Sequence, residues 1–224
     1  LAELNDLELW GTDIGNAYLE SYTKEKVAFV AGPEFGALEG HTFLIRKALY
    51  GLRSSGARWH DRLYDSLTGM GFTPCKSDPD IWMRPCNDHY EYIACYVDDL
   101  LIASKNPQGI IDALMAAPNN YKLKGTGPVN YHLGCDFFRD EDNTMCFGPK
   151  AYIERICLQF ESMFGTKPRA GHSSPLLNND HPELDDTELL DDDGIQQYQS
   201  LIGALQWTIS LGRFDITTAV MSMS

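Results

Sequence analysis

Apolar and polar residues alternate along much of the chain and predict a series of short strands. The clearest alternation covers residues 7–14, a predicted strand that ends at Asp13. Apolar runs on both sides of Tyr96-Val97-Asp98-Asp99 predict a hairpin with the two aspartates at its tip. Further strands are predicted at 26–30, 42–45 and 80–84, and a second hairpin at 129–138 and 144–147.

Helical spacing of apolar residues separates these strands. Trp59, Leu63, Leu67 and Met70 form one stripe, which predicts a helix that begins near Ser55. Apolar stripes of the same kind predict helices at 108–117, 149–160 and 198–209. Strands and helices are mixed in order and the strands form antiparallel hairpins, so we predict an α+β fold.

Composition and charge narrow the classes of protein to consider. The chain has 224 residues, of which 43% are hydrophobic, enough to build a core, and it contains no apolar run long enough to cross a membrane. The net charge of −14 argues against a generic nucleic-acid binder. Eight of the acids lie between Asp180 and Asp193, a stretch without Lys or Arg that we interpret as a solvated linker.

The six cysteines and six histidines suggest no metal site by their spacing. No two cysteines stand in a Cys-x-x-Cys pair, so we expect reduced thiols of an intracellular protein and no zinc site. The first residues show no signal peptide, and the chain does not begin with Met. We therefore expect it to be part of a longer polypeptide.

Three aspartates carry the candidate chemistry. Asp13 ends one predicted strand, and Asp98 and Asp99 stand at a hairpin tip, so the three carboxylates would converge if those strands are neighbours. Clustered carboxylates need cations, and Mg²⁺ prefers oxygen ligands. Two such ions about 3.5–4 Å apart can clamp an in-line phosphoryl displacement. The alternative for the hairpin alone is an ordinary Asp-rich turn.

Four blocks of the sequence resemble the reverse transcriptases of the Ty1/copia class. Residues 13–19 resemble motif A, residues 47–59 motif B, and residues 96–99 match motif C; residues 198–205 with 213–216 resemble the segment between polymerase and RNase H. The blocks stand in the family order and span nearly the whole chain. The resemblance implies a palm-like antiparallel sheet backed by helices, followed by a thumb- or connection-like helical segment. We assign the palm core, with motifs A to C and a primer-grip-like hairpin, to 1–147, and the helical segment, with the acidic linker 173–194, to 148–224.

The resemblance also implies roles for individual residues. Asp13, Asp98 and Asp99 would be catalytic and, with the carbonyl of Ile14, would bind two Mg²⁺ ions, with Mn²⁺ as an alternative. Tyr18 would be a steric gate against the 2′-hydroxyl of a ribonucleotide; a plain core aromatic is its alternative. The nucleotide pocket would further include Tyr50, Gly51 and Arg53, and the primer grip Tyr131, Leu133 and Gly134.

Some positions depart from the family pattern. Gly56 and Phe214 stand where relatives of this class have Pro, and His132 replaces a Phe, which weakens the primer-grip assignment. Finger strands before motif A and a C-terminal RNase H are absent from this sequence. We therefore expect an RNA-directed DNA polymerase by lineage, with weak or no activity of this segment alone.

The implied partners are an RNA template, a nucleic-acid primer, dNTPs and the rest of the Pol polyprotein (fingers, RNase H and integrase), with no membrane. The implied location is a cytoplasmic particle with later nuclear entry. The alternative function is a catalytically inactive remnant or a host-adopted interaction module that keeps the palm fold. The intact set Asp13, Asp98 and Asp99 favours the catalytic lineage.

Overall fold

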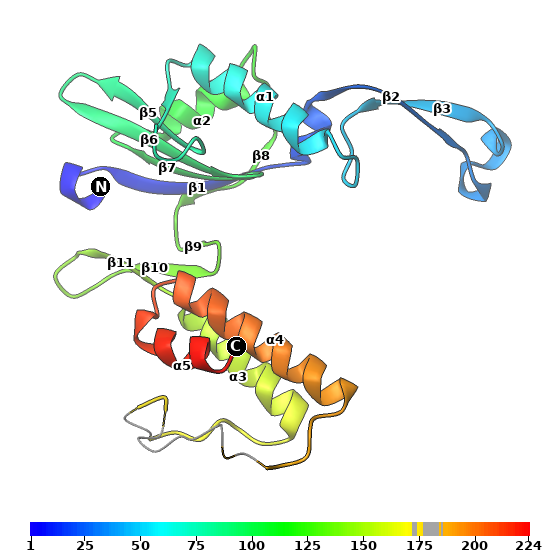
Figure 1. The fold of residues 1–224 in the computed structure, drawn as a ribbon. Helices are drawn as coiled ribbons and strands as arrows, with labels where there is room; N and C mark the ends of the chain where they lie inside the picture. The colour runs from blue at the N-terminus through cyan, green and yellow to red at the C-terminus, as the bar shows by residue number, and fades with distance from the viewer. Residues whose placement is uncertain (172–173, 177–183, 185) are drawn as a thin grey trace. The chain divides into compact units, whose positions relative to one another are not determined.

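The computed structural model describes residues 1–171, 174–176, 184 and 186–224 (Figure 1). The chain forms two compact units, Leu1–Val129 and Asn130–Ser224. Each strand pairing in the described parts is antiparallel, and helices accompany the strands in both units. The predicted α+β class, an antiparallel sheet backed by helices, is therefore confirmed.

A six-stranded sheet forms the body of the first unit, in the order β4-β5-β6-β7-β1-β8. Strand β1, the first in the chain, thus lies between β7, the second strand of the hairpin that carries Asp98 and Asp99, and β8, which follows α2 in the chain. The elements are β1 (Glu8–Ile14), β4 (Thr73–Pro74), β5 (Ile81–Cys86), β6 (His89–Tyr96), β7 (Asp99–Ser104), β8 (Leu123–Pro128), α1 (Ser55–Gly69), α2 (Pro107–Met115) and the short helices η1 (Glu3–Asn5) and η2 (Ala17–Glu20).

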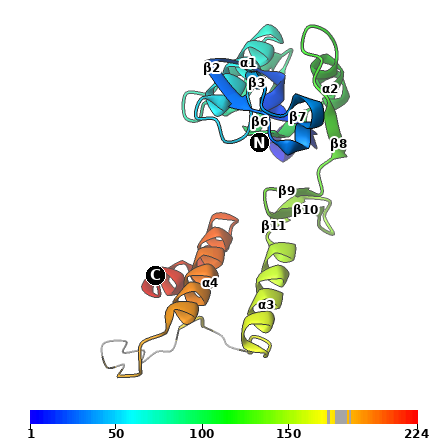
Figure 2. The same ribbon diagram turned by 90° about the vertical axis from the view of Figure 1, so that its right-hand side faces the viewer.

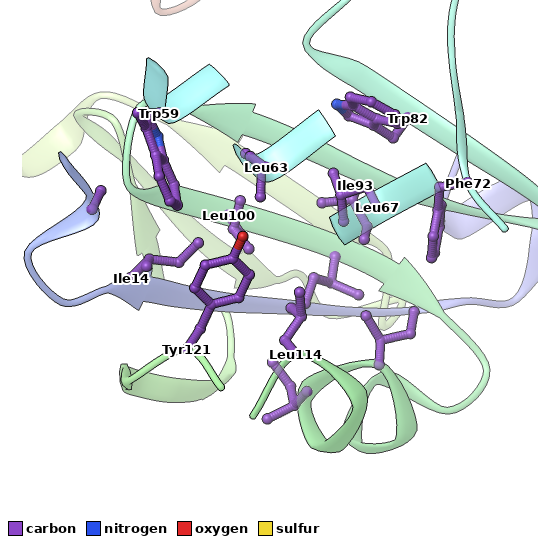
Figure 3. Packing of buried hydrophobic residues seen from close by; sticks show 14 residues of the cluster. Ile14, Trp59, Leu63, Leu67, Phe72, Trp82, Ile93, Leu100, Leu114 and Tyr121 are labelled. Atoms are coloured by element: carbon purple, nitrogen blue, oxygen red, sulfur yellow. The ribbon is translucent and has the colours of Figure 1, made fainter. Parts of the chain in front are cut away.

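The hydrophobic core lies between one face of this sheet and the helices α1 and α2 (Figure 3). Alternate strand residues point to the same face, so Ile14, Leu100 and Ile102 all point toward the helices and are fully buried. Trp59 and Leu67 of α1 pack onto them. The predicted apolar stripe of α1 is therefore the face that holds this helix on the sheet, and it fixes the strands that carry the aspartates.

A separate two-stranded hairpin extends from the first unit (Figure 1). It consists of β2 (Tyr22–Val30) and β3 (Thr42–Lys47), joined through the short helix η3 (Pro33–Leu38). Three phenylalanines, Phe29, Phe35 and Phe43, pack together near its end, with ring centroids 5.6–5.8 Å apart. These aromatic contacts stabilise a hairpin that forms a two-stranded sheet of its own.

The second unit combines a small sheet with helices (Figure 2). Its sheet has the order β11-β10-β9, and helix α3 packs against both β10 and α4. The elements are β9 (Tyr131–His132), β10 (Cys135–Arg139), β11 (Met145–Gly148), α3 (Lys150–Phe164), α4 (Asp192–Ser210), η5 (Phe214–Ile216) and α5 (Thr217–Ser222). No helix among the described residues is long and apolar enough to span a membrane.

Two predicted elements differ from the structure. Residues 129–138 do not form one strand, because Leu133 and Gly134 have φ of 49° and 96° and make a two-residue turn between β9 and β10. The end of the predicted linker 173–194 is helical, because the Asp191 carboxylate accepts a hydrogen bond from Gly194 N–H and caps α4. Residues 173, 177–183 and 185 of that linker lie outside the described residues. The compact units divide after residue 129; the functional boundary at 147 stays a prediction.

Candidate active site

The turn between β6 and β7 carries the first part of the site. Tyr96 pairs with Asp99, so the turn residues are Val97 and Asp98, and Asp99 is the first residue of β7. The prediction that both aspartates stand at the tip is therefore wrong for Asp99. Val97 has a φ of 57°, which costs a β-branched residue about 1–3 kcal/mol. Such strain persists only where the surrounding structure holds the turn.

Two hydrogen bonds hold this turn in place. The indole N–H of Trp59 donates to the carbonyl oxygen of Val97 at 2.6 Å, and the backbone N–H of Ile14 donates to the carbonyl oxygen of Asp98 at 2.8 Å. One donor comes from α1 and the other from the end of β1. The position of Asp98 is thus set from two sides by elements distant in sequence.

The pairing of β1 with β7 places Asp13 directly opposite Asp99. Residues opposite each other in an antiparallel pair lie on the same face, and Thr12 and Leu100 beside them point into the core. Asp13 and Asp99 therefore lie on the sheet face that α1 and α2 leave uncovered. The structure thus brings Asp13, Ile14, Asp98 and Asp99 to one edge of the sheet, and their roles as catalytic residues and metal ligands stay a prediction.

The three carboxylates do not form a closed cluster. In the described part of the chain, no group made of Asp13, Asp98 and Asp99 has its ligand oxygens all within 4.8 Å of one another. Asp98 lies in the turn and Asp99 in the strand, so neighbouring side chains point in different directions. The carboxylate oxygens at this edge therefore lie farther apart than the ligand atoms of a closed metal site.

Two tyrosines lie beside the aspartates. The rings of Tyr18, from η2, and Tyr50 have centroids 4.4 Å apart. Burial raises the pKa of Tyr50, and the charges of Asp98 and Asp13 raise it further, so its phenol lies in the field of these carboxylates. Tyr18 and Val97 also line a cavity of ≈ 190 Å³ at the start of α1. The structure therefore brings both predicted nucleotide-pocket tyrosines to the acidic edge.

The other predicted pocket residues lie in the loop between β3 and α1. Gly51 has a φ of +92°, and a Cβ added there would meet no atom within 4 Å. The backbone conformation of the turn therefore favours glycine, whereas no close contact with another described residue does. Arg53 is exposed. The hydroxyl of Ser55 donates to the carbonyl oxygen of Leu49 at 2.6 Å and closes this loop onto the start of α1.

The primer-grip candidates belong to the second unit. Tyr131 is in β9, and Leu133 and Gly134 form the turn to β10. A Cβ on Gly134 would lie 3.0 Å from the side chain of Leu211, which adds a steric reason for glycine to its positive φ. Their role at a primer stays a prediction.

Some residues of this edge were not predicted from the sequence. Lys124 of β8 pairs with Asp13, and its ammonium nitrogen lies 3.5 Å from the position that a Cβ of Gly15 would occupy. The backbone N–H of Gly15 donates to the carbonyl oxygen of Lys122 at 2.8 Å. Gly125 and Gly127 interrupt the alternation of apolar and polar residues in β8, so no strand pattern predicted that Lys124 would lie here.

Comparison with known proteins finds one matching family model and several similar proteins. The family model described as "Reverse transcriptase (RNA-dependent DNA polymerase)" matches residues 1–170. A transposon Ty5-1 protein of Saccharomyces cerevisiae is 26% identical over 216 residues, which is 95% of this chain and 68% of that protein. The Retrovirus-related Pol polyproteins from transposon RE1 of Arabidopsis thaliana and from transposon TNT 1-94 of Nicotiana tabacum are each 26% identical, over 95% and 98% of this chain.

The chain spans 14% and 17% of the lengths of these two plant polyproteins. The matched residues 1–170 include the whole first unit, with the paired strands that carry Asp13 and Asp99, and the start of the second. The chain belongs to the reverse transcriptase (RNA-dependent DNA polymerase) family.

Proposed function

We propose that this chain provides the polymerase centre of a copia-like retrotransposon reverse transcriptase, which joins a dNTP to the 3′-hydroxyl of a primer on an RNA template. The observation that carries the proposal is the edge at which Asp13 faces Asp99 and Ile14 N–H binds the Asp98 carbonyl. Family membership supports the same reaction. The relatives described as Pol polyproteins suggest that this segment works within a longer polypeptide.

The ligands at this edge fit a hard divalent cation. The donor set is all oxygen: the carboxylates of Asp13, Asp98 and Asp99 and the carbonyl of Ile14, which suits Mg²⁺, with Mn²⁺ as the alternative. When bound, two such ions activate the primer hydroxyl and neutralise the charge of the departing pyrophosphate. Without a cation, two carboxylates directly opposite each other in a sheet repel one another.

The side chains around the aspartates would bind and orient the nucleotide. The Tyr18–Tyr50 pair presents aromatic surface beside the carboxylates, on which the sugar of an incoming dNTP can rest. Gly51 keeps the loop before α1 free of a side chain, and Arg53 offers an exposed cation for a phosphate. Trp59 holds the turn that carries Asp98, so it acts as a positioning residue.

The direct test is RNA-templated DNA synthesis by a polypeptide that contains this chain together with its neighbouring polyprotein segments. We expect Mg²⁺-dependent incorporation of dNTPs into an annealed primer. Absence of incorporation by a folded polypeptide would favour the inactive remnant or the interaction module instead.

Replacing Tyr18 by Ala is expected to relax the choice of sugar. Removal of the ring opens space for a 2′-hydroxyl, so the ratio of rNTP to dNTP incorporation should rise by about tenfold or more, equivalent to about 1.4 kcal/mol. The ratio of the two incorporation efficiencies is measured with one primer and template. Tyr90→Ala, on β6 and likewise partly exposed, is the control and should leave the ratio unchanged. An unchanged ratio in Tyr18→Ala would exclude the gate role.

A further inference from the structure

A second set of metal-ligand side chains lies at the other end of the β5–β6 hairpin. Cys86 and His89 pair directly across the two-residue turn Asn87-Asp88, and Glu91 follows two residues after His89 on the same strand face. One ligand atom from each of Cys86, His89 and Glu91 lies within 4.8 Å of the others. Among the described residues, no other group of three His, Cys, Asp or Glu side chains meets this distance criterion.

This set is separate from the aspartate edge. Strand β6 runs from His89 to Tyr96, so at about 3.3 Å per residue the two ends are about 23 Å apart. The donor types also differ, because sulfur and imidazole nitrogen stand here in place of oxygen alone. Softer ligands of this kind select zinc rather than magnesium.

One ring nitrogen of His89 has no hydrogen-bond partner among the described residues. The side chain is only 9% exposed, and this buried nitrogen is Nε2. The Nδ1 of His89 lies 3.0 Å from a carboxylate oxygen of Asp88, which accepts the Nδ1–H. With Nδ1 as the donor, Nε2 is the ring nitrogen that can bind a metal ion. Metal-binding histidines are commonly oriented in this way by a carboxylate on the other nitrogen.

Hydrogen bonds from Arg84 and Ser104 hold the carboxylate of Glu91 in place. Its Oε2 accepts hydrogen bonds from Arg84 at 2.9 and 2.6 Å, and its Oε1 accepts one from the Ser104 hydroxyl at 2.6 Å. A carboxylate can accept about four such bonds, so one position on Oε1 remains for a metal.

We propose that Cys86, His89 and Glu91 form a zinc-binding site, with a water molecule as the fourth ligand. Ligand atoms of one tetrahedral zinc ion lie about 3.5 Å apart, so small side-chain movements close the set onto the ion. Asp88, Arg84 and Ser104 are the residues that orient the ligands. We expected no zinc site because no Cys-x-x-Cys pair exists, but Cys86 and His89 stand at the same spacing with histidine as the second ligand.

The site would stabilise the first unit through contacts that reach both helices. Arg84, which holds Glu91, also donates to the carbonyl oxygen of Met70 at the end of α1 at 2.8 Å. Ser104, which holds the other oxygen, accepts the N–H of Asn106, the residue that caps α2. Zinc bound to Glu91 would therefore fix the hairpin and both helix ends together.

The test titrates the untagged chain with Co²⁺, whose absorption reports a thiolate ligand and tetrahedral geometry. We expect one Co²⁺ per chain to bind with a sulfur-to-cobalt charge-transfer band, displacement of that ion by Zn²⁺, and a higher Tm in Zn²⁺ than in chelator. Cys86→Ser should lose the band and the Tm shift. Asp88→Asn should keep the band but weaken affinity about 10- to 100-fold.

Cys157→Ser is the matched control, because this cysteine is exposed on α3 of the second unit. It should bind Co²⁺ as the unaltered chain does, and circular dichroism of the metal-free proteins checks that each variant folds. No thiolate band in the unaltered chain would overturn the proposal whatever the variants do. A band that survives Cys86→Ser, or that disappears in Cys157→Ser, would overturn it equally.

Discussion

Replacing Asp98 by Asn is expected to abolish RNA-templated dNTP incorporation, with a loss of at least about 10³-fold, or about 4 kcal/mol of transition-state stabilisation. The amide has nearly the same size as the carboxylate but no negative charge for a cation. The backbone bond from Ile14 N–H to the Asp98 carbonyl does not involve the side chain, so the turn should keep its conformation. Incorporation is measured at saturating Mg²⁺ in the longer polypeptide.

Asp112→Asn is the matched control for this loss. Asp112 is an exposed aspartate of α2 whose carboxylate accepts a hydrogen bond from Gln108 within the same helix. Its substitution should leave incorporation unchanged, and both variants should keep the Tm of the unaltered protein within a few degrees. Unchanged incorporation in Asp98→Asn would remove this residue from the catalytic set.

Replacing Leu67 by Ala is expected to destabilise the protein by about 2–5 kcal/mol. Leu67 is fully buried in α1 and belongs to the cluster that holds this helix on the sheet. Ala is the best helix former, so the loss measures packing and cavity formation rather than helix propensity. The free energy of unfolding is taken from denaturation curves of the unaltered chain and the variant.

Leu158→Ala is the control, since Leu158 is also a helix residue, in α3, but is 66% exposed. Its change in stability should stay within about 0.5 kcal/mol. A small effect of Leu67→Ala would mean that α1 does not anchor the sheet, and would also weaken the argument that Trp59 of the same helix sets the active-site turn.

Local pattern was enough to predict most of the first unit. The stripe through Trp59, Leu63 and Leu67 identifies α1, and alternation identifies β1, because each pattern reflects a face that must be buried. The convergence of Asp13 with Asp98 and Asp99 required the pairing of β1 with β7, which is not a local property. The sequence predicts it only on the condition that the two strands are neighbours, and the structure shows that the strands pair, with Asp13 opposite Asp99.

Other features depend on contacts that the sequence does not display. The partner of β1 on its other edge, β8, is rich in glycine and was missed. The sequence pattern did not predict that Val97 and Asp98 are the turn residues between β6 and β7, because a β-branched residue such as Val97 disfavours a positive φ. Hydrogen bonds from Trp59 and Ile14 hold this conformation. The early start of α4 follows from the cap by Asp191, whose acidic surroundings had suggested only a linker.

The central claim, that the edge formed by Asp13, Asp98 and Asp99 holds divalent cations, is tested most directly by Mn²⁺ binding. The measurement is the loss of the free Mn²⁺ resonance signal on titration in the presence of a dNTP, in a Cys86→Ser background that removes the other ligand set. We predict saturable binding that is lost when Asp13 and Asp99 are both replaced by Asn and retained in Asp112→Asn. Equal binding in the double variant and its parent would contradict the claim.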